Sequence, residues 1–122
     1  MTSVDDLIQR WLPHTDITPT QLWHRINSEE MILLVMPGDD GGVQAIAGVE
    51  LSEDSVHVTM VAGQDVHRWL GQLVEVVSGL AESQGRVRIT TRGRRGWDRL
   101  LAPYGFRREG DELNKVVKHG IQ

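Results

Sequence analysis

The spacing of hydrophobic residues predicts two helices at the start of the chain. Apolar residues at positions 4, 7, 8, 11 and 12 fall on one face of a helix, which Pro13 ends. Thr18, Pro19 and Gln21 are typical of a helix start, because threonine caps the first amides and proline fits the first turn. A second helix is therefore expected directly after Thr18.

The next segments predict three strands. Residues 31–36 are a continuous apolar run that ends at a loop rich in glycine and aspartate, residues 37–42. Residues 43–51 are the expected partner strand. In residues 56–62, apolar side chains at the even positions alternate with a second set of side chains at the odd positions, as in a strand with one buried face.

Helices and strands alternate in the rest of the chain. Residues 65–84 have a long apolar helix face and precede Gly85, which favours a helix end. A strand is expected at 86–91, a short helix at 97–104, and either a strand pair or one bent strand at 106–117. The resulting order, ααβββαβαβ, predicts an α+β fold in which helices flank a mixed sheet. A length of 122 residues predicts one domain over residues 1–122.

Composition excludes several kinds of chemistry. The chain has no cysteine, and its five histidines lack the His-x-x-x-His spacing of a metal site, so no metal is expected. No apolar run is long enough to span a membrane, and the first residues lack the basic and apolar regions of a signal peptide. We therefore expect a cytoplasmic protein with no membrane partner.

Charge is distributed unevenly along the chain. Residues 1–82 carry 3 Lys and Arg against 13 Asp and Glu, whereas residues 83–122 carry 10 against 4. Arginine binds carboxylate or phosphate through two parallel hydrogen bonds. We therefore expect a surface that binds other proteins, made of Arg86, Arg88, Arg92, Arg94, Arg95, Arg99, Arg107 and Arg108.

Two other interpretations of these arginines stay open. They could form a solvated face that pairs with the chain's own acids, or they could bind nucleic acid. The acidic net charge of −4 and the few aromatic residues among the arginines disfavour nucleic acid.

Residues 92–106 predict a short helix that a glycine stops directly before a strand. This segment, Arg92-Gly-Arg-Arg-Gly-Trp-Asp-Arg-Leu-Leu-Ala-Pro-Tyr-Gly-Phe106, resembles the closing helix-strand unit of the GNAT acetyltransferases. The predicted order of elements also resembles that of a compact GNAT domain. The resemblance implies the GNAT fold and, for an active member, transfer of an acetyl group from acetyl-CoA to an amine.

The GNAT cofactor loop is altered in this chain. Active GNAT enzymes hold the pyrophosphate of coenzyme A on the backbone amides of a Gln/Arg-x-x-Gly-x-Gly/Ala loop. Alignment on Gln64 puts His67 and Trp69 at the two glycine positions, and Asp65 is expected to cap the helix and repel a diphosphate. We therefore expect no cofactor. If the chain is an active enzyme, the residues expected to hold acetyl-CoA are Val61, Gly63, Gln64, His67 and Arg68.

A second GNAT pattern, Asn-x-x-Ala-x-x-x-Tyr-x-x-x-Gly-Phe, often supplies a tyrosine that protonates the leaving thiolate. Anchored on Gly105, the pattern puts Leu101 at the tyrosine position and Tyr104 three residues later. Leucine cannot donate a proton, which favours a non-catalytic protein. For an active enzyme the catalytic candidates are Glu50, His57 and Tyr104, although a structural role is the better explanation of the first two: an outward-facing strand carboxylate for Glu50, and a surface or satisfied strand residue for His57.

Residues 93–101 also resemble the Gly-Arg-Arg-Gly-Trp-Asp/Glu-Arg-x-Leu segment of small bacteriophage proteins encoded near head and packaging genes. That resemblance implies a virion or assembly protein, located in the host cytoplasm or in the virion. Its partners would be other proteins or further copies of itself. The main hypothesis is therefore a non-catalytic GNAT-like interaction module. The alternatives are an acetyl-CoA-dependent N-acetyltransferase with an atypical cofactor loop and a nucleic-acid-associated factor.

Overall fold

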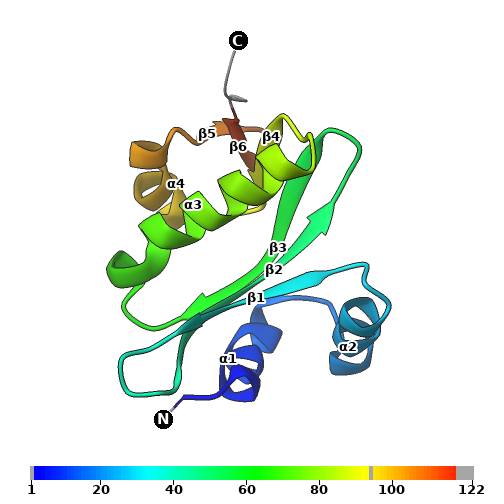
Figure 1. Cartoon of the computed structure of the whole chain (residues 1–122), viewed down its shortest axis with the longest axis vertical. Coiled ribbons are helices and arrows are strands. Elements are labelled where there is room, and N and C mark those ends of the chain that lie inside the picture. The colour runs from blue at the N-terminus through cyan, green and yellow to red at the C-terminus, as the bar shows by residue number, and fades with distance from the viewer. Residues whose placement is uncertain (1, 94, 118–122) are drawn as a thin grey trace. The chain divides into compact units, whose positions relative to one another are not determined.

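The computed structural model describes residues 2–93 and 95–117 (Figure 1). Its strands form a mixed six-stranded sheet in the order β1-β2-β3-β4-β6-β5. The predicted α+β class is confirmed, and the last segment forms two strands. The elements are α1 (Val4–Trp11), η1 (Leu12–His14), α2 (Pro19–Asn27), β1 (Ile32–Pro37), β2 (Val43–Leu51), β3 (Ser55–Gly63), α3 (Val66–Ser83), β4 (Arg88–Thr91), α4 (Arg95–Leu101), η2 (Ala102–Tyr104), β5 (Arg107–Glu109) and β6 (Glu112–Val116).

The residues group into two compact units, each built from two separate segments. Unit 1 comprises Met1–Glu50 and Thr59–Trp69, and unit 2 comprises Leu51–Val58 and Leu70–Gln122. Strand β3 and helix α3 each contribute residues to both units. The single domain expected over residues 1–122 stays a prediction.

Both N-terminal helices of unit 1 begin with a capping box. The Thr18 hydroxyl accepts a hydrogen bond from the Gln21 amide, and the Gln21 side chain accepts one from the Thr18 amide, as the sequence predicts. Ser3 and Asp6 form the same pair at the start of α1. The hydrogen bond from the Ser3 backbone N–H lowers the pKa of Asp6 below its ordinary value.

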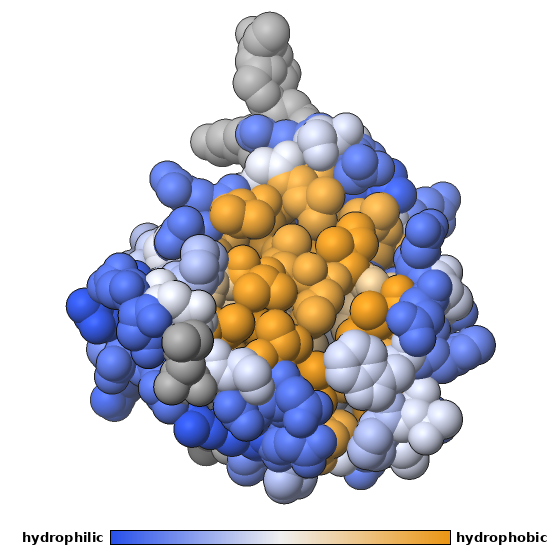
Figure 2. Space-filling model, turned by 60° about the horizontal axis from the view of Figure 1, so that its bottom comes forward, coloured by the Kyte–Doolittle hydropathy of each residue, from blue (hydrophilic) through white to orange (hydrophobic). Residues whose placement is uncertain are grey.

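The core of unit 1 lies between its two helices and its strands. The side chains that are almost fully buried there are Leu7, Ile8, Leu22, Met31, Ile46 and Met60. Strands β1 and β2 pair in antiparallel register from Ile32 with Val49 to Met36 with Ala45. Strand β1 is at the edge of the sheet, and its side chains Ile32 and Val35 are 37% and 45% exposed. Figure 2 shows that apolar side chains gather on one face of the molecule, with polar side chains around them.

Unit 2 contains the only parallel strand pair among the described residues. Strand β3 pairs with β4 from Ser55 with Arg88 to Val58 with Thr91. The pairing stops there, although β3 itself continues to Gly63. Strand β6 pairs in antiparallel register with both β4 and β5. Strand β4 thus pairs over its whole length with the beginning of β3, and the rest of β3, from Thr59 to Gly63, has no β4 partner.

Glycine ends α3, as the sequence predicts. Gly85 has a φ of +69°, and the amide of Arg86 reaches back to the carbonyl of Ala81 at 2.8 Å. No helix in the described part of the chain is long and apolar enough to cross a membrane.

Candidate functional site

The loop between β3 and α3 is held tightly against β2 within unit 1. The Gln64 amide donates to the carbonyl of Gln44 at 3.2 Å, and the Trp69 indole N–H donates to the carbonyl of Gln64 at 2.7 Å. A Cβ at Gly63 would lie 2.7 Å from the Ala45 Cβ and 2.8 Å from the Gln44 carbonyl oxygen. Glycine is therefore required here by close packing of the loop.

Asp65 does not cap α3 as the sequence suggested. No hydrogen bond joins its carboxylate to a helix amide within residues 2–93 and 95–117. Its φ is instead +54°, a left-handed conformation that aspartate tolerates better than most residues. Its carbonyl accepts the Arg68 amide at 2.8 Å and so forms the first turn. The first amides of a helix have no partner within it, so the amides of α3 that precede Arg68 are available to a ligand.

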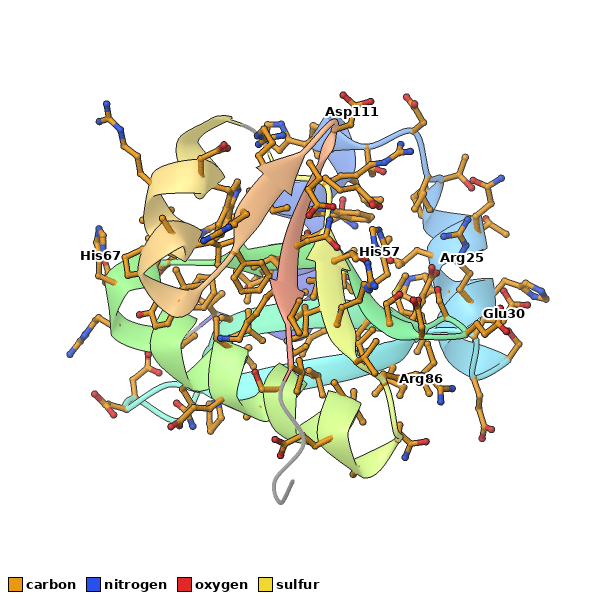
Figure 3. The ribbon with its side chains drawn as sticks, turned by 90° about the horizontal axis from the view of Figure 1, so that it is seen from above. Arg25, Glu30, His57, His67, Arg86 and Asp111 are labelled. Atoms are coloured by element: carbon orange, nitrogen blue, oxygen red, sulfur yellow. The ribbon has the colours of Figure 1, made fainter. Side chains whose placement is uncertain are left out.

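His67 and Trp69 do not cover this loop in the way that their alignment on the family glycines implied. Trp69 is 3% exposed and lies beneath the loop, to which its indole is hydrogen-bonded. The His67 side chain is exposed and points away from the ribbon at the start of α3 (Figure 3). Although His67 and Trp69 are bulky and stand at the family's glycine positions, neither side chain lies over the outer surface of the loop.

Two arginines of unit 1 flank the same loop. With its oxygen turned toward Arg10, the Gln64 side-chain amide accepts hydrogen bonds from both terminal nitrogens of Arg10, at 2.8 and 3.0 Å. The Arg68 side chain is 65% exposed, and its nearest acid, Asp39, is 3.9 Å away and almost fully exposed. Sequence reasoning missed Arg10, although only three arginines precede residue 83 and two of them flank this loop.

A polar pocket of about 310 Å³ lies within unit 2. It opens over the paired parts of β3, β4 and β6 and the turn that precedes β3. Its lining is almost entirely polar or charged. The lining residues are Ser52, Asp54, Ser55, His57, Arg88, Thr90, Glu109, Glu112 and Asn114.

His57, which the sequence predicts as a candidate base, is one of the residues that line this pocket. Its Nδ1 lies 2.8 Å from the Thr90 hydroxyl and 3.9 Å from the Glu112 carboxylate. Thr90 is opposite His57 in the parallel register, and Figure 3 shows His57 beside β4. The Thr90 hydroxyl can donate to Nδ1 or accept a hydrogen bond from it, depending on the tautomer of the ring. Sequence reasoning did not find Thr90 or Glu112, because they reach His57 only through strand pairing.

The other two catalytic candidates lie elsewhere. Glu50 belongs to unit 1, where its carboxylate pairs with Arg25 at 3.2 Å. Tyr104 is half-buried in η2, with its hydroxyl 3.2 Å from where a Cβ would be at Gly71 of α3. Leu101, at the family tyrosine position, is 5% exposed. The structure does not bring Glu50 or Tyr104 into the lining of the His57 pocket.

Several of the C-terminal arginines bind within their own unit. Arg108 donates two hydrogen bonds to Asp98, at 2.7 and 2.5 Å, which raise the pKa of Arg108 above its ordinary value. Arg88 lies 3.5 Å from Asp54, and Arg86 donates to the Gln84 carbonyl. Arg92, Arg99 and Arg107 are exposed; Arg94 and the side chain of Arg95 lie outside the described residues. A protein-binding arginine surface stays a prediction.

The described residues contain no group of three or more His, Asp or Glu side chains that could hold a metal ion.

Known proteins resemble this chain in structure. No protein-family model and no curated protein sequence matches it. YhbS of Escherichia coli, a GNAT family N-acetyltransferase in complex with CoA, has a TM-score of 0.68 at 17% identity, over 94% of this chain and 74% of that one. Tetrahymena GCN5 has a TM-score of 0.66 at 9% identity, over 96% and 88%. The PaiA N-acetyltransferase of Thermoplasma acidophilum, in complex with coenzyme A, has a TM-score of 0.63 at 13% identity, over 80% and 70%.

These likenesses correct one expectation from the sequence. The absence of a cofactor was expected because the loop was thought to be blocked, yet two of the three similar structures contain coenzyme A. The resemblance to GNAT proteins is confirmed at the level of the fold, whereas a bacteriophage origin stays a prediction. The described chain has the GNAT acetyltransferase fold.

Proposed function

We propose that this protein is an acetyl-CoA-dependent N-acetyltransferase. The observation that carries the proposal is the loop from Gly63 to Arg68, which two arginines flank and whose residues, apart from Val66, are exposed. Structural neighbours that were crystallised with coenzyme A support it. A non-catalytic module would not need a cationic, open helix start in an otherwise acidic part of the chain.

The loop offers two kinds of interaction to a diphosphate. The first amides of α3 point out of the helix start, where the helix dipole favours an anion. The guanidinium groups of Arg10 and Arg68 add charge-assisted hydrogen bonds that lysine could not match in geometry. In this proposal the bound acetyl-CoA supplies an activated thioester, and the chain's own residues bind its diphosphate and orient it.

Replacing Arg68 by alanine is expected to weaken binding of coenzyme A. The loss should be about fivefold, since the guanidinium is exposed and screened by solvent. Isothermal titration of coenzyme A into the wild-type chain and the variant measures the difference. Arg107→Ala is the matched control, because it removes an arginine of unit 2 that is also exposed. Equal affinities for both variants would contradict the assignment of the loop.

Replacing Asp65 by asparagine is expected to strengthen binding of coenzyme A by about threefold, because it removes a negative charge at the helix start. Asparagine also tolerates the left-handed φ of +54°, so the loop conformation should persist. The same titration checks the result. A weaker complex in Asp65→Asn would show that this carboxylate does not face the ligand.

Acetyl transfer itself is tested by following release of the free thiol of coenzyme A in the presence of a panel of primary amines. Amine-dependent release above the rate of hydrolysis supports the enzyme. Micromolar binding of coenzyme A without any release would favour a binding module, and no binding at all would overturn the proposal.

A further inference from the structure

Strand β1 is one of the two edges of the sheet, and it lacks the features that usually protect an edge (Figure 1). Its residues, Ile32–Pro37, include no charged side chain, and the only proline is the last of them. The side chains of Ile32 and Val35 are exposed. The other edge, β5, consists of three charged residues, Arg107–Glu109. A short, charged edge resists pairing with another strand, whereas a longer apolar edge favours it.

The contacts at the start of β1 indicate which of its main-chain groups face outward. The Met31 amide donates to the Arg25 carbonyl of α2 and therefore points away from β2. Along a strand of an antiparallel pair, successive residues direct their main-chain groups to opposite sides. Leu33 and Val35 therefore also direct their amides and carbonyls away from β2.

The contacts at the other end of β1 lead to the same assignment. The Gln44 carbonyl of β2 accepts the Gln64 amide, which follows β3, and so it faces β3. The next residue, Ala45, then faces β1, where its partner is Met36. Because Met36 directs its main chain toward β2, its neighbour Val35 directs its own outward.

The outward main-chain groups of Leu33 and Val35 are left without partners. Neither residue makes a backbone hydrogen bond to a loop, turn or cap in the described part of the chain. The side chains around them are apolar on both faces of the strand, because Ile32 and Leu34 point to the face opposite that of Leu33 and Val35. Unpaired main-chain groups between apolar side chains are what an added strand requires.

Acidic residues stand at both ends of this edge. Glu29 and Glu30 lie directly before β1, and both are exposed. Asp39 follows β1, and its side chain is 98% exposed. These charges favour a ligand that is basic at both ends.

The same acids disfavour a second copy of this chain as the occupant. Antiparallel pairing of two β1 strands about Leu34 would bring Glu30 of one copy opposite Gly38 of the other, next to Asp39. Parallel pairing would bring Glu30 beside its own counterpart. Like charges side by side on paired strands are destabilising.

We propose that the edge of β1 binds an extended segment of a partner protein, apolar at its centre and with arginine or lysine at both ends. The segment adds to the sheet as a strand. Its main chain bonds with Leu33 and Val35, and its basic ends pair with Glu30 and Asp39. A single added strand makes a small interface, so the complex is weak and transient.

The test uses the full chain and the peptide acetyl-Arg-Arg-Val-Val-Ala-Val-Val-Arg-Arg-amide. This peptide has no primary amine, so its binding is independent of any acetyl transfer. We expect it to slow hydrogen exchange of the Leu33 and Val35 amides and to shift the NMR signals of β1. Two matched peptides, one with glutamate in place of every arginine and one with N-methylated central amides, should each bind about tenfold more weakly or worse. Equal affinities for the three peptides, or protection confined to other strands, would overturn the proposal.

Variants of the chain test the same edge from the other side. Glu30→Gln and Asp39→Asn should each weaken the basic peptide about threefold, because both carboxylates are exposed. Glu75→Gln, which removes an exposed carboxylate from α3, is the matched control and should leave the affinity unchanged. Val35→Pro removes an outward amide but no bond to β2, and it should abolish binding while circular dichroism shows a folded chain.

The oligomeric state of the chain alone decides between the two occupants. Sedimentation should show a monomer, with the Leu33 and Val35 amides exchanging quickly in the absence of the peptide. A dimer in which both amides are protected would mean that a second copy takes the edge, and it would overturn the proposal. The peptide comparisons do not depend on any variant, so they stay decisive if Val35→Pro fails to fold.

Discussion

Replacing Ile46 by alanine is expected to lower the free energy of unfolding by about 2–5 kcal/mol. Ile46 is fully buried on β2 and packs in the core of unit 1 with Leu22, Met31 and Met60. The substitution removes three buried carbon atoms and leaves a cavity, because the side chains that surround Ile46 in the core relax only partially. Urea unfolding followed by circular dichroism measures the change.

Ile32→Ala is the matched control for this prediction. It is the same substitution on the neighbouring strand β1, where the side chain is 37% exposed and pairs with Val49. Its cost should be about 1 kcal/mol, since less apolar surface leaves water on folding and no closed cavity forms. Similar losses at both positions would show that the six-residue cluster is not the core that stabilises unit 1.

Replacing Gly63 by alanine is expected to cost about 1–3 kcal/mol of stability through overpacking. The added methyl group would lie 2.7 Å from the Ala45 Cβ, 2.8 Å from the Gln44 carbonyl oxygen and 2.9 Å from the Trp69 ring. Two of these contacts involve β2, which cannot retreat without disturbing its pairing with β1. The loop must therefore shift, and we expect weaker binding of coenzyme A as well.

Gly79→Ala is the control of opposite sign. Gly79 lies inside α3, and a Cβ there would meet no atom within 4 Å. Alanine should raise the free energy of unfolding by about 0.5–1 kcal/mol, because it loses less backbone entropy in a helix than glycine does. Thermal unfolding of the two variants measures both shifts, and a stabilised Gly63→Ala variant would contradict the packing seen around the loop.

The sequence predicted the secondary structure well because the deciding signals are local. The capping box of Thr18 and Gln21 and the stop at Gly85 each depend on residues within one turn of a helix. The turn before β6 is of the same kind, since Gly110 adopts a φ of +64°. Helix caps and glycine turns can therefore be predicted from neighbouring residues alone, without knowledge of any distant contact.

The cofactor loop shows where local reasoning failed. His67 and Trp69 were expected to obstruct a ligand because both are bulky, but the sequence does not specify which way their side chains point. Trp69 is instead buried, with its indole bonded to the Gln64 carbonyl, and His67 faces solvent. Asp65 was expected to cap the helix, yet its backbone is left-handed, with a φ of +54°, and no hydrogen bond from a helix amide to its carboxylate is found in the described part of the chain. Side-chain direction depends on backbone angles and packing, which residue type does not specify.

By itself, the sequence determined the α+β class, the order of the elements and the resemblance of residues 92–106 to the GNAT fold. Only the tertiary structure decided which side chains act together. It brought Arg10 to Gln64 across 54 positions of sequence, and it placed Thr90 and Glu112 around His57 through strand register. The reason is physical: helix caps and glycine stops are set within a few residues, whereas a binding site depends on contacts that form only when distant strands pair.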